Sequence, residues 1–151
     1  MFPKWHILIG SVFAYILVTF FNFSLIAGIV IFLSSILIDL DHYFLYIIQQ
    51  KKFSPSKFWE YSIDLDNKIN KLSTREKAKY KLPIFAFHGI EFWSMIILLS
   101  FINPVFYWII LGIIIHMIPD FIELIYAKDP LYLKLSIIIV YITNKKKKTF
   151  S

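Results

Sequence analysis

Two long apolar segments dominate the pattern of hydrophobic and polar positions along this chain. Lysine and arginine are absent from residues 5–50 and again from residues 82–127, two segments of about 46 residues each. One membrane-spanning helix needs about 20 apolar residues, so each segment has room for two. The apolar runs are continuous rather than alternating, which favours helices. The pattern therefore predicts an all-α, polytopic membrane protein.

Short polar interruptions divide each apolar segment in two. The first segment is interrupted at Asn22-Phe23-Ser24 and the second at Asn103-Pro104. Proline disfavours helix in the residue before it and fits the first turn of a new helix. The prediction is a single helical membrane domain, 1–151, with four spans at roughly residues 5–20, 24–46, 83–102 and 104–125.

The segment between the two apolar halves, residues 51–81, is strongly basic, with nine Lys or Arg against four acids. Loops rich in these residues stay in the cytoplasm, so we expect this loop and the N-terminus to be cytoplasmic in an integral cell-membrane protein. We interpret the loop as a topology signal that contacts anionic membrane lipids, with nucleic acid a distant alternative. Ser73 followed by Glu76 matches a capping box and predicts a short helix toward Tyr80.

The C-terminal apolar segment, Leu131–Thr143, has only 13 residues, contains Lys134 and is followed by four lysines at 145–148. A fifth span would place those lysines outside the cell, against the charge rule. We therefore predict a short surface-lying or re-entrant segment with a cytoplasmic tail.

Composition narrows the class of protein further. Hydrophobic residues make up 58% of the chain and charged residues 17%, whereas soluble domains are about 45–50% apolar and about 25% charged. These values exclude a disordered tail, a collagen-like fibre and a soluble nucleic-acid-binding domain. The absence of cysteine excludes a disulfide framework and a thiol nucleophile. The net charge of +6 belongs to the loop and the chain ends, so it reports orientation in the membrane.

The apolar segments nevertheless hold all four histidines and five of the ten acids. These residues are His6, Asp39, Asp41, His42, His88, Glu91, His116, Asp120 and Glu123. A charged residue at mid-bilayer costs about 2.5–3.5 kcal/mol on insertion scales, and no basic residue lies in the same predicted spans. The acids therefore need another cation, either protons or a metal.

Three predicted spans carry a histidine and an acid at matched depth. At about 1.5 Å per helical residue these pairs lie about 10–18 Å from the nearest flanking lysine, all toward the cytoplasmic side. Spacings of i,i+3 or i,i+4 place both members of a pair on one helix face. The pairs are Asp39 with His42, His88 with Glu91, and His116 with Asp120.

Two further residues, His6 and Asp41, can approach these pairs only if the backbone near them is displaced or bent. His6 begins the first span on the same side and would have to sink inward. Asp41 would point away from Asp39 in a regular helix, so either the helix loosens there or Asp41 has another partner.

Imidazole with carboxylate suits zinc, manganese or iron. The number of side chains exceeds the needs of one tetrahedral metal, so one or two divalent ions are expected, and two-metal sites commonly cleave phosphoesters. Glu91 is a candidate catalytic base or ligand. The candidate metal ligands are His6, Asp39, Asp41, His42, His88, His116 and Asp120.

The order of these motifs resembles a known family. The motifs are His6, Asp39-Leu40-Asp41-His42, His88 and His116-Met117-Ile118-Pro119-Asp120. This order is similar to that of the prokaryotic membrane-bound, predicted metal-dependent hydrolases, which are related by pattern to zinc-dependent phospholipase C-like proteins. The resemblance covers roughly residues 1–120 and implies a metal site more firmly than a reaction. Together with the two-metal chemistry it leads us to expect a membrane-embedded metal-dependent hydrolase that acts on a phosphoester or lipid substrate. Many members carry His-Arg-x-x-Thr-His-Ser at the third motif, where this chain reads Phe87-His88-Gly89-Ile90-Glu91-Phe92 and lacks the arginine.

Two other classes of function fit the same residues. A cation or proton transporter would use the polar cluster as a transit site, although four spans are few for a transporter monomer. A non-catalytic membrane scaffold would use the polar groups to bond its helices together. Bound metal would separate the hydrolase from the scaffold, and ion uptake into vesicles would identify the transporter.

Overall fold

The computed structural model describes residues 3–148, and its regular elements are helices and one isolated bridge between Tyr80 and Lys148. The prediction of an all-α chain is confirmed. In chain order the elements are α1 (Pro3–Phe20), α2 (Leu25–Leu37), α3 (Leu40–Gln50), α4 (Pro55–Asn70), α5 (Thr74–Lys77), α6 (Ile90–Ser100), α7 (Val105–Tyr126), the 3₁₀ turn η1 (Leu131–Leu133) and α8 (Ile137–Asn144).

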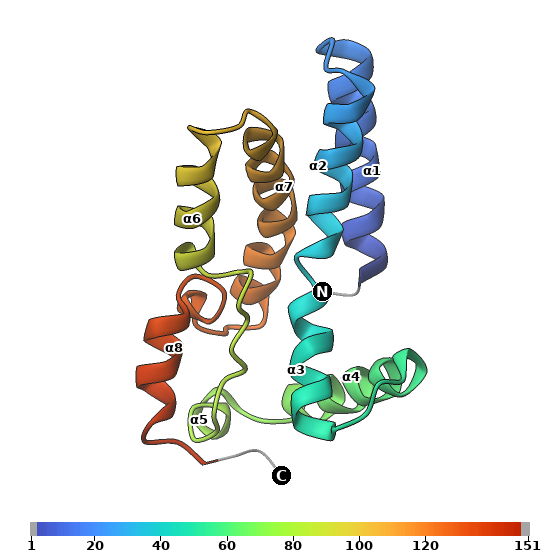
Figure 1. Cartoon of the computed structure of the whole chain (residues 1–151). Coiled ribbons are helices and arrows are strands. Elements are labelled where there is room, and N and C mark those ends of the chain that lie inside the picture. The colour runs from blue at the N-terminus through green and yellow to red at the C-terminus, as the bar shows by residue number, and fades with distance from the viewer. Residues whose placement is uncertain (1–2, 149–151) are drawn as a thin grey trace.

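The helices form two tiers (Figure 1). In the upper tier, α7 packs against α1, α2 and α6, and the α1–α2 and α6–α7 connections lie at the same end. The lower tier holds α3, α4, α5 and α8. The chain passes from one tier to the other where α2 ends, before α6 begins and where α7 ends.

Close contact between α2 and α7 depends on Gly112. A Cβ at this position would meet Ser34 Oγ and, at 2.5 Å, the backbone oxygen of Ile31. Small residues at such crossings let helix backbones approach, which is the usual packing device of helices in lipid. The buried residues Ile38 and Ile113 pack in the hydrophobic core beside this crossing.

Two stretches are long and apolar enough to cross a membrane, Leu25–Gln50 and Val105–Tyr126. Two further apolar helical stretches are shorter than these two: Lys4–Phe20 in α1, and α6. The 11 residues of α6 rise only about 16 Å, roughly half the thickness of a hydrocarbon core. The structure therefore supplies four apolar stretches in the predicted order, of which two are long enough to span a membrane, and the prediction of four spans is not confirmed.

Two of the predicted spans are not continuous helices. The prediction for 24–46 is interrupted at Ile38 and Asp39, which form a turn between α2 and α3. The prediction for 83–102 is wrong for 83–89, because α6 begins only at Ile90. Pro83 has no amide to donate, and the amide of Phe87 donates to Asp41 Oδ2 at 3.0 Å instead of to a helical carbonyl.

The capping box forms as expected at the start of α5. The amide of Ser73 donates to Glu76 Oε2 at 2.8 Å, and the Ser73 hydroxyl accepts from the Glu76 amide at 3.4 Å. Hydrogen bonds from the Ser73 hydroxyl and amide hold the pKa of Glu76 below its ordinary value. The short helix ends at Lys77, three residues before Tyr80.

The C-terminal segment folds back against the loop that precedes α6. The eight residues of α8 rise about 12 Å, too little to cross a bilayer. The side-chain amide of Asn144 donates to Leu82 O and accepts from Leu82 N, both at 2.8 Å. This geometry agrees with a surface or re-entrant segment rather than a fifth span.

Candidate metal centre

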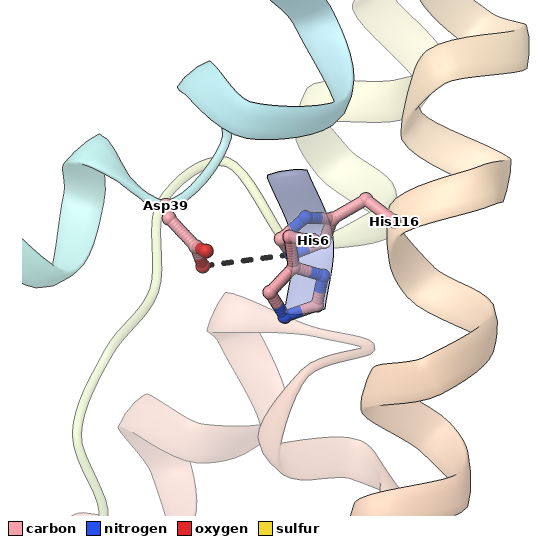
Figure 2. A group of neighbouring side chains, drawn as sticks. All are labelled: His6, Asp39 and His116. Atoms are coloured by element: carbon pink, nitrogen blue, oxygen red, sulfur yellow. Dashed lines mark ion pairs between the residues drawn. The ribbon is translucent and has the colours of Figure 1, made fainter. Parts of the chain in front are cut away.

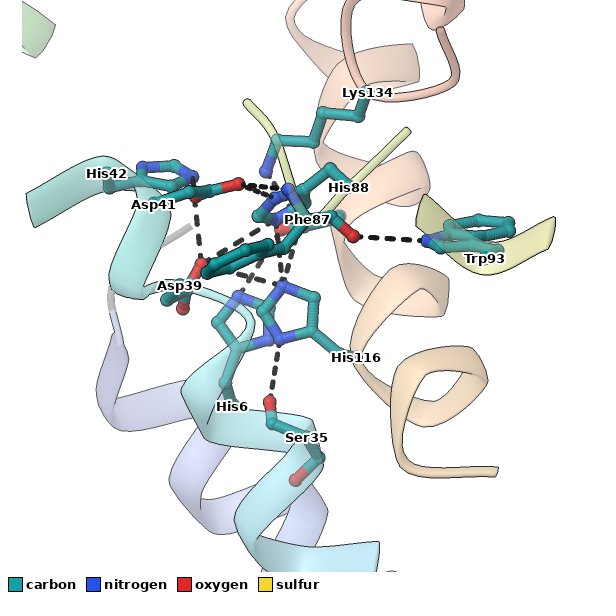
Figure 3. A network of polar contacts seen from close by, with 11 residues as sticks. His6, Ser35, Asp39, Asp41, His42, Phe87, His88, Trp93, His116 and Lys134 are labelled. Atoms are coloured by element: carbon teal, nitrogen blue, oxygen red, sulfur yellow. Dashed lines mark hydrogen bonds and ion pairs between the residues drawn. The ribbon is translucent and has the colours of Figure 1, made fainter. Parts of the chain in front are cut away.

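Polar side chains meet at the boundary between the two tiers (Figure 3). They come from α1, from the α2–α3 turn, from α3, from α7 and from the loop that precedes α6. His6 comes from the first turn of α1 and is buried, so the N-terminal helix does sink inward. His88, His116 and Asp120 are almost fully enclosed, with exposures of 0–1%. The seven predicted ligands therefore occupy one region, which we call the cluster: His6, Asp39, Asp41, His42, His88, His116 and Asp120.

The turn between α2 and α3 brings Asp39 and Asp41 to the same side. Its backbone is held by the Asp39 amide donating to Ile36 O and the His42 amide donating to Asp39 O, both at 3.1 Å. Asp39 Oδ1 then lies 3.5 Å from His116 Nε2, and Asp41 Oδ2 lies 2.9 Å from His88 Nδ1. Both conditions considered for Asp41 hold: the helix loosens, and Asp41 has its own partner.

Two imidazoles have one nitrogen committed as a hydrogen-bond donor. His116 Nδ1 lies 2.7 Å from the backbone oxygen of Ser35, which can only accept, so Nδ1 carries the hydrogen. His88 Nδ1 lies 2.9 Å from the Asp41 carboxylate and donates in the same way. In the neutral rings, the Nε2 atoms of His88 and His116 therefore present lone pairs.

These lone pairs point into a common space with carboxylate oxygens. The Nε2 atoms of His88 and His116 are 3.2 Å apart, and Asp120 Oδ2 lies 3.3 Å and 3.1 Å from them. Asp39 Oδ1 is 3.7 Å from His88 Nε2 and 3.5 Å from His116 Nε2. Acceptors this close repel one another unless protons or a metal ion lie between them.

The cluster also contains buried polar atoms that make no hydrogen bond within residues 3–148. They are His6 Nδ1, His6 Nε2, Asp41 Oδ1, His42 Nε2 and Asp120 Oδ1. Four of these atoms face one another in pairs: His6 Nε2 lies 3.3 Å from Asp120 Oδ1, and His42 Nε2 lies 3.7 Å from Asp41 Oδ1. Buried polar groups nearly always have a hydrogen-bond partner, and a group that lacks one within the protein commonly binds a water or an ion. Such a concentration of donor atoms fits a site that binds a cation.

Three overlapping sets of residues could each hold a metal ion, with ligand atoms within 4.8 Å of one another. Figure 2 shows the first set, in which the ring of His6 stacks on His116 at 3.9 Å between centroids. The first and second sets share Asp39 alone. The sets are His6 with Asp39 and His116, Asp39 with His42 and His88, and His88 with His116 and Asp120.

Sequence reasoning missed Lys134, which enters the cluster from the turn after η1. Its ammonium lies 2.6 Å from Asp120 Oδ2, and the residue is buried. The cluster holds the three carboxylates of Asp39, Asp41 and Asp120, and Lys134 contacts that of Asp120. Ionised carboxylates and one ammonium leave two negative charges when the histidines are neutral. That surplus matches a divalent cation. The one available signal was a lone lysine inside an apolar C-terminal segment.

Glu91, the predicted catalytic residue, lies apart from the cluster and holds α8. Its carboxylate accepts from Ser136 Oγ at 2.6 Å and from the amides of Ile137 and Ile138 at 3.2 Å. These contacts satisfy amides at the start of α8, which is the role of a helix cap. Glu123 is exposed on α7 and belongs to none of the three sets.

The geometry therefore offers inward-facing nitrogen and oxygen ligands with a second layer that orients them. Asp41 and the Ser35 carbonyl fix the tautomers of His88 and His116, as partners of metal-bound histidines commonly do. Comparisons of this chain with protein-family models, with curated proteins and with solved structures find no match.

Proposed function

We propose that this chain is an integral membrane protein that binds a divalent metal in the cluster and uses it to hydrolyse a phosphoester. The observation that carries the proposal is the convergence of His88 Nε2, His116 Nε2 and Asp120 Oδ2 within 3.1–3.3 Å of one another. Both ring nitrogens are lone-pair atoms when the rings are neutral, so a metal ion satisfies all three ligands at once.

Zinc is the proposed metal, with manganese or iron as substitutes, because imidazole and carboxylate suit all three. His88, His116, Asp120 and Asp39 are the central ligands. His6 and His42 belong to two different sets and would extend the site to a second ion, with Asp39 common to both sets. Asp41 is assigned an orienting role on His88 rather than a ligand role.

A divalent metal held by these residues would supply a water of lowered pKa as the nucleophile at neutral pH. The protein's own residues supply the remaining parts. Asp41 holds the tautomer of His88, and Asp120 is shared among His6, His116 and Lys134. Asp39 is partly exposed, so it lies where the buried cluster meets a substrate.

The membrane part of the proposal places α1, the α2–α3 stretch, α6 and α7 in the bilayer, with the basic segment 51–81 in the cytoplasm. Large apolar side chains on all four elements face outward, among them Phe20, Leu25, Leu98 and Ile114. Exposed apolar surface of this extent is typical of an interaction with lipid or another protein. The order of the His and Asp motifs, similar to that of membrane-bound predicted hydrolases, supports the same assignment.

Metal content of the purified full-length chain tests this function. After removal of loosely bound ions, we expect one or two equivalents of zinc, manganese or iron per chain. The double substitution His88→Ala with His116→Ala should abolish binding, and Asp66→Asn, on the exposed face of α4, should retain it. A metal-free wild-type protein, or full occupancy in the double variant, contradicts the site.

Catalysis is tested separately with bis(p-nitrophenyl) phosphate as a soluble phosphodiester. We expect turnover that is lost with a chelator and restored by the metal. Circular dichroism checks that each variant keeps its helices. Stoichiometric metal without turnover contradicts the hydrolase. Absence of metal with loss of helix in the double variant instead supports a scaffold role for the cluster.

A further inference from the structure

An apolar groove runs between α2 and the pair α6–α7 and ends at the cluster. Its cavity measures about 360 Å³. Leu33 and Leu37 line it from α2, Phe92 from α6 and Ile109 from α7, and Phe87 closes it from the loop before α6. A cavity of this size falls in the range that proteins use for small ligands.

Within residues 3–148, Ser34 is the one polar residue that lines the groove. Its hydroxyl donates to its own helix at Val30 O and Ile31 O, at 2.7 Å and 3.1 Å, so it is not available to a polar ligand. A peptide segment in this groove would leave its amides without partners, which is costly in an apolar site. A hydrocarbon chain has no such demand, so it is the occupant that the lining favours.

Two lining residues connect the groove directly to the cluster. Ile38 precedes Asp39, and Phe87 precedes His88. Phe87 also donates its amide to Asp41 Oδ2 at 3.0 Å, so one residue contacts both sites. From Leu33 to Leu37 the groove follows α2 toward the cluster. A chain lying in the groove would therefore present its end at Asp39 and His88.

The cluster end carries a cation suited to an anionic headgroup. Lys134 is buried, with its ammonium 2.6 Å from Asp120 Oδ2 and 5.9 Å from the centroid of the Phe85 ring. This ammonium is a basic group in direct contact with the cluster. A phosphate entering the acidic cluster needs such a charge, because carboxylates alone would repel it.

We propose that the substrate is a phospholipid with an acidic headgroup, which lies with one acyl chain in the groove and its phosphate at Lys134. This inference rests on the proposed function and adds the class of substrate and its orientation. The helices that line the groove include both stretches long enough to cross a membrane, so the groove can open to the lipid phase.

The first experiment compares a lipid with a soluble phosphodiester. Leu33→Trp fills the groove, and Leu98→Trp places the same ring at an exposed position on α6 outside it. We expect Leu33→Trp to lower the hydrolysis of phosphatidylglycerol vesicles at least tenfold, with metal content and bis(p-nitrophenyl) phosphate turnover within twofold of wild type. Leu98→Trp should leave both rates unchanged. An unchanged lipid rate in Leu33→Trp overturns the proposal.

A second experiment needs no catalysis, so it tests lipid binding in the groove independently of the proposed hydrolase activity. A phosphatidylglycerol carrying a photoreactive diazirine in one acyl chain is cross-linked to the full chain in phosphatidylcholine vesicles. We expect labelling at Leu33 and Ile109 above that at Leu98, lost in Leu33→Trp. Lys134→Met should reduce labelling severalfold for this probe and leave it unchanged for a diacylglycerol probe. Equal labelling of all positions, or no effect of Lys134→Met, overturns the proposal that the lipid binds in the groove, even if the soluble phosphodiester is hydrolysed.

Discussion

His88 and His116 face each other through their Nε2 atoms at 3.2 Å, and each ring has its other nitrogen bonded to an acceptor. This arrangement makes two lone pairs meet when the rings are neutral. An unoccupied pair of this kind is unfavourable, and a shared cation relieves it. The distance between these two nitrogens therefore indicates that the site favours a bound cation.

Asp41→Asn tests the orienting role of Asp41. Partners of metal-bound histidines typically contribute about 10–100-fold in metal affinity, so we expect a loss of that order with unchanged stoichiometry at saturating metal. Competition with a chromogenic chelator measures the affinity. The matched control is Asp66→Asn on exposed α4, which should bind like wild type. A change in stoichiometry would instead make Asp41 a ligand.

Lys134→Met tests the competition between the ammonium and a metal for Asp120. Two unit charges at about 4 Å interact by about 4 kcal/mol at an effective dielectric constant of 20, so removing the lysine should favour a divalent ion. We expect zinc to bind more tightly, by about tenfold or more, in Lys134→Met, and with near wild-type affinity in Lys134→Arg. Isothermal titration of the metal-free protein gives the two constants. Weaker binding in Lys134→Met would show that the lysine supports the metal site.

Glu91→Ala tests the capping role that the structure gives this residue. Loss of the hydrogen bonds to Ser136, Ile137 and Ile138 should destabilise the start of α8 by about 1–2 kcal/mol. Limited proteolysis should then cut more readily within 137–144, while metal content stays at the wild-type value. Glu91→Gln keeps an acceptor and should be intermediate. Complete loss of metal in Glu91→Ala would instead indicate that Glu91 is a metal ligand.

Gly112→Val tests the close approach of α2 and α7. A Cβ at this position would meet Ser34 Oγ and the Ile31 backbone oxygen, and overpacking of this kind costs typically about 1–3 kcal/mol. We expect a lower melting temperature in detergent, followed by circular dichroism. Ile114→Val, on the exposed side of the same helix, should melt near wild type. Equal melting temperatures of Gly112→Val and wild type would mean that α2 and α7 can move apart without loss of stability.

Local sequence determined most of the helices and the pairing of His116 with Asp120. His116 and Asp120 share a face of α7 because four residues complete about one helical turn, and His116 Nε2 lies 3.1 Å from Asp120 Oδ2. Ser73 and Glu76 form a capping box for the same reason of short spacing. The gaps without lysine or arginine likewise predicted where the apolar helices lie.

Tertiary structure decided which charges belong to the cluster. Lys134 reaches Asp120 only because the chain reverses after α7. Glu91 caps α8 only because the start of α8 lies next to the start of α6. Asp41 faces His88 because the chain turns at Asp39. Helical periodicity relates residues three or four positions apart, whereas these contacts join residues separated by 14 to 47 positions. Such contacts depend on how whole helices pack, so hydrophobic pattern and spacing predicted the seven His and Asp members of the cluster but neither Lys134 nor the contacts between helices that join them.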